Sequence, residues 1–186
     1  LNPSHPFLLG QLFSVATGRC DWKNSQTLGS KLIERAELNE KVARPFVFLH
    51  TSASLSLQKL AAEIYIRDRI SIAKMIAQNP PSRIVGRKKI RIGYISSDFK
   101  EHPVGILMEH LLKMHNREQY EVYGFFLNAS TNDPLEHRLV DIFDATFNLH
   151  GVVDSEAVSL VRACKLDIAI DLNGHTSGAR TALFAN

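Results

Sequence analysis

A strand–helix alternation that fills residues 90–186 limits the possible folds of this chain more than any other feature. Short stretches with the composition of strands alternate with stretches that have helical periodicity. This order predicts an α/β fold in which helices cover both faces of a parallel sheet. The predicted strands lie at 90–95, 120–127, 146–149 and 168–172, and the predicted helices at 103–115, 134–143, 156–165 and 179–185.

Two local signals add detail to this expectation. Asp154 and Ser155 stand directly before the third predicted helix and are expected to cap it. The stretch 168–172 is apolar almost throughout, which predicts a strand buried in the sheet. A helix that starts near residue 179 should lead to a further strand, so we expect this chain to be a fragment of a longer polypeptide.

The alternation also predicts where a ligand would bind. A doubly wound sheet has the strand order three-two-one-four, which makes neighbours of the strands at 90–95 and 168–172. A crevice then opens between the loops that follow them, 96–102 and 173–178. These are the loops of this half that are richest in polar, Gly and His residues, so we expect the functional site there.

The first part of the chain has helical periodicity instead. An apolar run at 46–49 fits either a short strand or a linker. Trp22 is expected to be a packing anchor between segments. The predicted helices cover 6–16, then 28–42, which Pro45 would end, and then 54–77, which could break near Arg67 and Asp68.

Two adjacent prolines mark the expected boundary between the two parts. Pro80 and Pro81 cannot continue a helix. We therefore expect a helical segment over residues 1–82, followed by an incomplete, Rossmann-like parallel sheet over residues 83–186.

Charge and cysteine content exclude several classes of protein. Residues 1–89 carry 14 Lys and Arg against 6 Asp and Glu, a net +8, whereas residues 90–186 carry 8 against 13, a net −5. The basic charges are spread along the helical patterns and indicate solvated faces, so no nucleic-acid partner is expected. No apolar stretch is long enough to span a membrane. Cys20 and Cys164 lie far apart, which favours a reducing, cytoplasmic location over a disulfide framework.

His102 is the strongest candidate for a catalytic residue. It ends the first loop directly before Pro103, at the start of a predicted helix, where an imidazole could take a proton from a hydroxyl or could serve as an N-terminal cap. Asp98 could orient His102, bind a hydroxyl, or simply form a turn with its own backbone.

The facing loop supplies the other candidates. Asn173, His175 and Thr176 could bind a ligand, and Gly174 allows close approach of the backbone. The alternative is a tight strand-to-helix turn with a polar cap. The sequence has no His-x-x-x-His or Cys-x-x-Cys spacing, so no metal is expected. It also lacks the Gly-rich patterns of dinucleotide and nucleotide triphosphate sites, so no cofactor is expected.

Several segments together resemble the O-linked N-acetylglucosamine transferase family, glycosyltransferase family 41. The strongest is Lys89-Ile-Arg-Ile-Gly-Tyr-Ile-Ser-Ser-Asp-Phe99, followed by His102-Pro103 and Leu107-Met108. A second is Asp171-Leu-Asn-Gly-His-Thr-Ser-Gly-Ala-Arg180, followed by Leu183-Phe184-Ala185. The helical part adds Leu9-Gly-Gln-Leu12, Cys20-Asp21-Trp22, Pro45-Phe46 and Gln58-Lys-Leu-Ala-Ala62, which are similar to the junction between the family's tetratricopeptide repeats and its catalytic region.

The resemblance implies the N-terminal lobe of a GT-B glycosyltransferase. Members of the family transfer N-acetylglucosamine from UDP-GlcNAc to Ser or Thr hydroxyls of proteins, with inversion and without a metal. A position matching His102 has been considered the catalytic base, and the loop matching 173–178 lines the same cleft. His175 stands where many members have an aromatic residue.

The resemblance also implies what this chain lacks. Most donor contacts in the family come from a C-terminal lobe, so we expect this chain to supply the acceptor-side half of the cleft and to be inactive alone. The alternatives are an Asn-directed glucosyltransferase of the same family and a non-catalytic protein-interaction module. A dehydrogenase or methyltransferase would need the Gly-rich fingerprint that is missing here.

Overall fold

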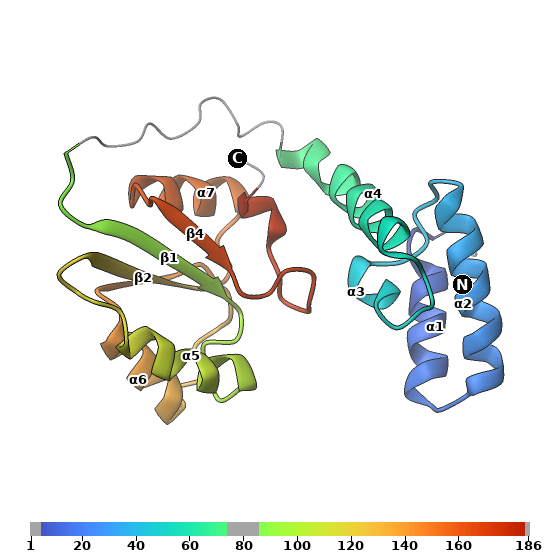
Figure 1. Ribbon diagram of the computed structural model, residues 1–186, viewed down its shortest axis with the longest axis horizontal. Coiled ribbons are helices and arrows are strands. Elements are labelled where there is room, and N and C mark those ends of the chain that lie inside the picture. Colours follow the sequence, from blue (N-terminus) through green and yellow to red (C-terminus); the bar gives the residue numbers. More distant parts are fainter. Residues whose placement is uncertain (1–4, 74–85, 185–186) are drawn as a thin grey trace. The chain divides into compact units, whose positions relative to one another are not determined.

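The computed structural model describes residues 5–73 and 86–184 (Figure 1). The chain divides into two compact units, Leu1–Ile72 and Ala73–Asn186. The boundary expected after residue 82 and the expected end of a helix at residue 77 both lie outside the described residues. Within the described residues, no helix is both long and apolar enough to span a membrane.

The first unit is built from helices. α1 and α2 lie side by side in an α-hairpin (Figure 1). The unit's core contains Phe13 of α1, Leu32 and Ala36 of α2, and the fully buried Phe48. The described helices of this unit are α1 (Leu8–Gly18), α2 (Trp22–Glu37), α3 (Pro45–Phe48) and α4 (Leu55–Ala73).

The second predicted helix is wrong at both ends. Asp21 caps α2 by accepting a hydrogen bond from the amide of Asn24 at 3.2 Å, so the helix begins at Trp22 rather than at residue 28. It ends at Glu37, because the chain reverses at Asn39, whose φ is +61°. Trp22 is 65% exposed and is not the packing anchor that we expected.

The next two expectations also need correction. Pro45 does not end a helix but occupies the first turn of the short helix α3, where its missing N–H costs nothing. The run 46–49 is therefore neither a strand nor a linker. α4 passes through Arg67 and Asp68 without a break.

The second unit confirms the predicted α/β fold. Its four described strands form a parallel sheet in the order β3-β2-β1-β4. Ile90 pairs with Tyr120 across β1 and β2, and Ile92 pairs with Ile168 across β1 and β4. The elements are β1 (Ile90–Ser96), α5 (Pro103–Lys113), β2 (Tyr120–Phe126), α6 (Pro134–Ile142), β3 (Ala145–Asn148), α7 (Asp154–Ala163), β4 (Ile168–Asp171) and the 3₁₀ turn η1 (Thr181–Phe184).

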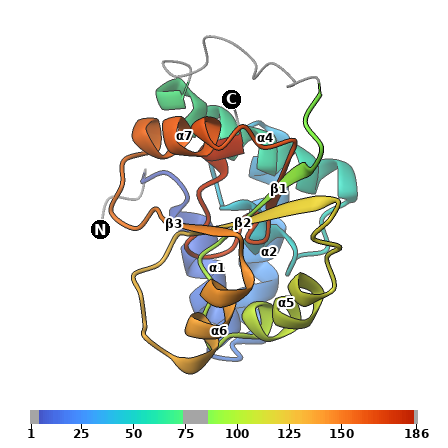
Figure 2. The ribbon, with the colours of Figure 1, turned by 90° about the vertical axis from the view of Figure 1, so that its left-hand side faces the viewer.

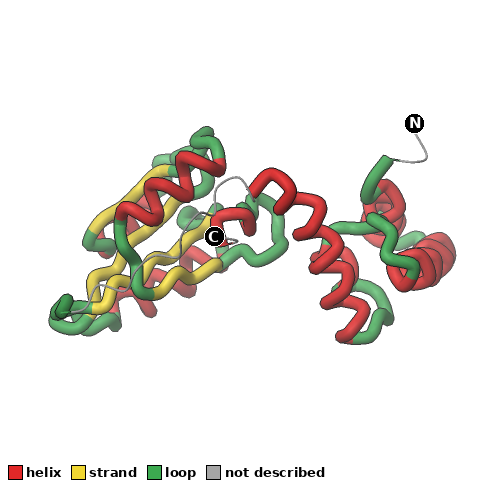
Figure 3. The backbone as a smooth tube through the Cα atoms, turned by 90° about the horizontal axis from the view of Figure 1, so that it is seen from above, coloured by secondary structure: helices red, strands yellow, loops and turns green. Residues whose placement is uncertain are grey.

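Helices cover both faces of the sheet, as predicted. α5 and α6 lie on one face and α7 on the other (Figures 2 and 3). Successive strand residues point to opposite faces, so β1 sends Ile92 and Tyr94 toward α5 and α6 and sends Ile95 toward α7. The same alternation in β2 places Val122 on the first side and Phe125 on the second.

Three details of this unit differ from expectation. Val153 is the N-cap of α7 and Asp154 lies inside the first turn, where its carboxylate accepts hydrogen bonds from Arg180 instead of capping the helix. β4 is an edge strand among the described residues, and Ile168 is 46% exposed rather than buried. The helix expected from residue 179 is a 3₁₀ turn that begins at Thr181, and its predicted end at residue 185 lies outside the described part.

Candidate active site

The two predicted loops meet at the carboxyl edge of the sheet. β1 and β4 are neighbours, as predicted, and the pairing of Ile95 with Asp171 brings the ends of both strands together. The chain leaves them as the loops 97–102 and 172–180. Residues that are far apart in sequence can therefore exchange hydrogen bonds here.

Asn173 joins these loops. Its side-chain Oδ1 accepts a hydrogen bond from the amide of Ser97 at 2.7 Å. Its Nδ2 donates to Ser97 Oγ at 2.8 Å, to Asp98 Oδ2 at 2.9 Å and to Thr176 Oγ1 at 3.2 Å. Only 4% of Asn173 is exposed, so this side chain forms the floor between the loops.

The turn around Asn173 is stabilised from both sides. Asp171 Oδ1 accepts hydrogen bonds from the amides of Asn173 at 2.9 Å and Gly174 at 3.1 Å. Thr176 donates its hydroxyl to the carbonyl of Asn173 at 2.9 Å. Gly174 is exposed and has a φ of +55°, a left-handed conformation that the turn requires and that favours glycine. A Cβ at this position would meet nothing within 4 Å. His175 is half-buried beside it.

His102 ends the first loop and is the N-cap of α5. Its Nδ1 accepts a hydrogen bond from the amide of Val104 at 3.3 Å. The same Nδ1 lies 4.0 Å from Asp98 Oδ2. Pro103 is exposed at the first helical position, where a proline fits without losing a hydrogen bond. The capping role that the sequence left open is therefore present in the structure.

Two glycines allow the loops to approach each other. A Cβ on Gly105 would collide with the backbone oxygen of Lys100 and would lie 3.0 Å from that of Asp98, so only glycine lets α5 start so close to the first loop. A Cβ on Gly178, which has a φ of +80°, would lie 2.7 Å from Ser97 Oγ.

The first loop is also held from the side of α6. The carboxylate of Asp133 accepts hydrogen bonds from the amides of Glu101 at 3.0 Å and Glu136 at 2.7 Å, the second of which caps α6. Together with the hydroxyl of Thr131, which contributes most, these bonds lower the pKa of Asp133 to about 2. Asp133 is therefore ionised at neutral pH and fixes the loop that ends in His102.

The structure brings together Asp98, Asn173 and Thr176 directly and places His102 beside Asp98. Pro103 begins α5 directly after the first loop, and Gly174 and His175 lie on the second loop. Sequence reasoning did not select Ser97, Gly105 or Arg180 as site residues. Arg180 holds the end of the second loop by donating to Asp154 and to the carbonyls of Leu149 and Val152.

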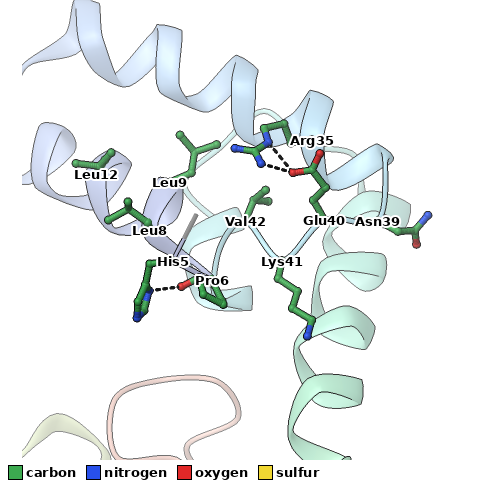
Figure 4. Close-up of a pocket in the computed structure, with 10 residues that line it drawn as sticks. All are labelled: His5, Pro6, Leu8, Leu9, Leu12, Arg35, Asn39, Glu40, Lys41 and Val42. Atoms are coloured by element: carbon green, nitrogen blue, oxygen red, sulfur yellow. Dashed lines mark hydrogen bonds and ion pairs between the residues drawn. The ribbon is translucent and has the colours of Figure 1, made fainter. Parts of the chain in front are cut away.

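A pocket of about 510 Å³ lies elsewhere, in the helical unit (Figure 4). Its apolar wall is Leu8, Leu9 and Leu12 of α1, and at its rim Arg35 forms an ion pair with Glu40. None of the site residues predicted from the sequence lines it. Among residues 5–73 and 86–184, no group of three or more His, Cys, Asp or Glu side chains is placed to hold a metal ion.

Known proteins resemble this chain along most of its length. The sequence model of glycosyl transferase family 41 matches residues 20–186. A probable UDP-N-acetylglucosamine–peptide N-acetylglucosaminyltransferase of Arabidopsis thaliana, SEC, is 37% identical over 106 residues, which are 57% of this chain and 11% of that protein. The UDP-N-acetylglucosamine–peptide N-acetylglucosaminyltransferase of Caenorhabditis elegans is 28% identical over 181 residues, which are 89% of this chain and 16% of that protein.

A solved structure shares the fold. A mutant of the O-GlcNAc transferase from Thermobaculum terrenum superposes with a TM-score of 0.68 at 23% sequence identity, over 95% of this chain and 34% of that protein. This chain thus spans only a small part of its relatives' length. Since the family match includes both loops of the candidate site and most of the helical unit, the chain belongs to glycosyl transferase family 41.

Proposed function

We propose that this chain forms the acceptor-side half of the active site of a protein glycosyltransferase. The whole enzyme would move N-acetylglucosamine from UDP-GlcNAc to Ser or Thr hydroxyls of proteins, with inversion and without a metal. The observation that carries the proposal is the meeting of the two loops at Asn173, inside the region matched by the family. The names of the Arabidopsis and Caenorhabditis relatives support the donor and the peptide acceptor.

The chemistry needs a group of the kind that His102 offers. In an inverting transfer the acceptor oxygen forms a bond to the anomeric carbon while the bond from that carbon to the diphosphate breaks. UDP leaves with the electron pair, and the hydroxyl proton passes to a base. We propose His102 as that base, since it stands half-exposed beside Asp98 at the carboxyl edge of the sheet.

The remaining predicted residues would shape the acceptor side of the cleft. The exposed edge would present backbone and side-chain groups to the acceptor peptide, above a floor formed by the buried amide. In this proposal the acceptor side consists of Asp98, Pro103, Asn173, Gly174, His175 and Thr176.

Other parts of the proposal concern the whole enzyme. A C-terminal lobe would hold most of UDP-GlcNAc and complete a GT-B architecture, and tetratricopeptide repeats before the helical unit would recruit the acceptor protein. The relatives extend far beyond the segment matched here, which leaves room for both. We propose a cytoplasmic location, from the two distant cysteines alone.

The test is a transfer assay with the longest natural polypeptide that contains this chain. UDP-GlcNAc and UDP-glucose would be offered separately to a protein lysate with EDTA present, and intact masses of the products would be measured. A gain of one N-acetylhexosamine is expected. A gain of hexose on Asn would instead establish the glucosyltransferase, and no gain with either donor would favour the interaction module.

A matched pair of histidine variants links the activity to the site. His102→Asn should abolish most transfer, while His110→Asn, on the exposed side of α5, should leave it unchanged. Equal transfer activity of the two variants would show that transfer does not depend on His102, which would contradict the proposed site.

A further inference from the structure

We propose that Asp98 decides which ring nitrogen of His102 carries the proton, and that Asn173 acts as the positioning residue that holds Asp98 in place. The inference rests on the proposed function, in which His102 receives the proton of the acceptor hydroxyl. The inference adds the condition under which His102 can receive that proton.

The observed arrangement of His102 cannot accept that proton. The backbone amide of Val104 can only donate, so Nδ1, which lies 3.3 Å from it, must be the unprotonated nitrogen. The proton of the neutral ring then sits on Nε2. An Nε2–H can donate a hydrogen bond to an oxygen but has no lone pair with which to take a proton.

The carboxylate of Asp98 offers the opposite arrangement. It only accepts, and its Oδ2 lies 4.0 Å from the same Nδ1. A hydrogen bond between them would require Nδ1–H and would leave the lone pair on Nε2. The two arrangements exclude each other because both use Nδ1.

The change between them is small. Hydrogen bonds from nitrogen to oxygen are usually about 2.7–3.2 Å long, so the ring would have to approach Asp98 by about 1 Å. The bond from Val104 is already at the long end of the usual range. With 41% of the His102 side chain exposed, the ring has room to move.

Asp98 itself is held rigidly. The Ser97 amide fixes Oδ1 of Asn173 at 2.7 Å, which settles the orientation of the Asn173 amide group and directs its Nδ2 to Asp98 Oδ2 at 2.9 Å. The other carboxylate oxygen accepts from Ser97 Oγ at 3.2 Å, and the Asp98 amide donates to Ser96 Oγ at 3.0 Å. The carboxylate therefore stays turned toward His102.

The side-chain amide of Asn173 makes its hydrogen bonds to other residues of the protein. All its contacts given above are to Ser97, Asp98 and Thr176, and 4% of the residue is exposed. This is the environment of a group that positions others rather than one that contacts substrate. During transfer, Nε2 would take the hydroxyl proton and Nδ1–H would donate to Asp98, which would stabilise the imidazolium.

The first test reads the tautomer directly. The 186-residue chain would be labelled with ¹⁵N-histidine, and two-bond ¹H–¹⁵N correlations of the imidazole rings would be recorded at a pH where the rings are neutral. We expect His102 to populate both tautomers in the unaltered chain, and the Nδ1–H form to be lost in Asp98→Ala, which has no side-chain acceptor. Signals of the exposed His110 and His150 should not change, which also reports that the variant is folded.

A second variant tests the positioning role of Asn173 while the Asp98 carboxylate is kept. Asn173→Ser removes the donor to Asp98 and leaves the carboxylate in place, so it should reduce the Nδ1–H form of His102 without abolishing it. The same tautomer ratio in the unaltered chain and in Asp98→Ala would overturn the inference, as would an unaltered chain that shows the Nε2–H form alone.

The second test measures catalysis with the longest natural polypeptide. Asp98→Ala should lower kcat about tenfold or more while the KM for the donor changes less than about twofold. The control Asp141→Ala, which removes an exposed carboxylate on α6, should alter neither. A lower affinity for the donor with unchanged kcat would contradict a role through His102. If the unaltered polypeptide transfers no sugar, the proposed function fails, and the tautomer measurement still decides the inference about Asp98.

Discussion

His102 occupies the N-cap position of α5, so a substitution there changes the helix start and the candidate chemistry at once. Its Nδ1 accepts from the Val104 amide, and an alanine would leave that amide without its partner. Asparagine has a side-chain oxygen that can replace the capping nitrogen but cannot act as a base near neutral pH. The two variants therefore separate the two roles.

We expect both His102→Ala and His102→Asn to lower transfer roughly 10²–10⁴-fold in the complete enzyme. Only His102→Ala should lower the free energy of unfolding, by about 0.5–1 kcal/mol, the lower part of the range for lost caps, because the bond is long. Denaturant unfolding and the transfer assay measure the two effects. Near-normal turnover in His102→Asn would leave His102 with its capping role alone.

Gly105 is a second position where a small substitution should have a large effect on stability. An added Cβ would meet backbone oxygens of Lys100 and Asp98, which cannot rotate away as a side chain would. Gly105→Ala should lower the free energy of unfolding by about 1–3 kcal/mol. Gly18→Ala is the matched control, since a Cβ there has nothing within 4 Å and a helical alanine should be neutral or stabilising. Equal effects in denaturant unfolding would show that the start of α5 tolerates displacement.

At the scale of elements, the start of α6 and the first loop share one carboxylate. Asp133 caps the helix through the Glu136 amide and holds the loop through the Glu101 amide. Glu136 is buried at the same corner. Burial raises the pKa of its carboxyl, but hydrogen bonds from Thr131, Ser130 and the amide of Asn132 together outweigh burial and lower that pKa. Both carboxylates are thus more acidic in the folded chain than in the unfolded one.

The lowered pKa values of these two carboxyl groups predict that the folded chain loses stability in acid. The pKa of Asp133 falls from its ordinary value of 3.8 to about 2 on folding, so the unfolded chain binds the proton more readily. The stabilisation is complete above pH 3.8 and is lost as the pH falls toward 2. We expect Asp133→Asn to be less stable than the unaltered chain at pH 6 and the difference to shrink toward pH 2.5 in denaturant unfolding. A difference that stays constant with pH would mean that the carboxylate charge contributes nothing.

Elements also show where local signals suffice. Pro103, and Asp133 followed by Pro134, start α5 and α6 where the sequence predicted, because capping and the fixed φ of proline act within one turn. The prediction for α2 is wrong for a similarly local reason: Asp21 caps the helix, whereas the apolar pattern begins only at Leu28. β4 is exposed although its composition is that of a buried strand, because exposure depends on which neighbours are present.

At the scale of the whole molecule, this chain matches only part of its relatives. It spans 34% of the solved O-GlcNAc transferase and 16% of the Caenorhabditis enzyme. We expect the 186-residue chain alone to transfer no sugar, because the acceptor-side loops would have no second lobe to hold the donor. The same intact-mass assay on this chain and on the longest natural polypeptide tests this. Transfer by the short chain would place donor binding within residues 1–186.

The amino-acid sequence is enough to predict the α/β alternation, the neighbouring positions of β1 and β4, and the two loops that meet at the sheet edge. These follow from periodicity, local capping and the chain topology of parallel sheets. The hydrogen-bond partners of the loop residues, in contrast, depend on the folded structure. Ser97 and Asn173 are 76 positions apart, and no local pattern shows that their hydrogen bonds leave Asp98 facing His102. Packing of distant segments sets those distances, and in our proposal they decide which ring nitrogen of His102 carries the proton.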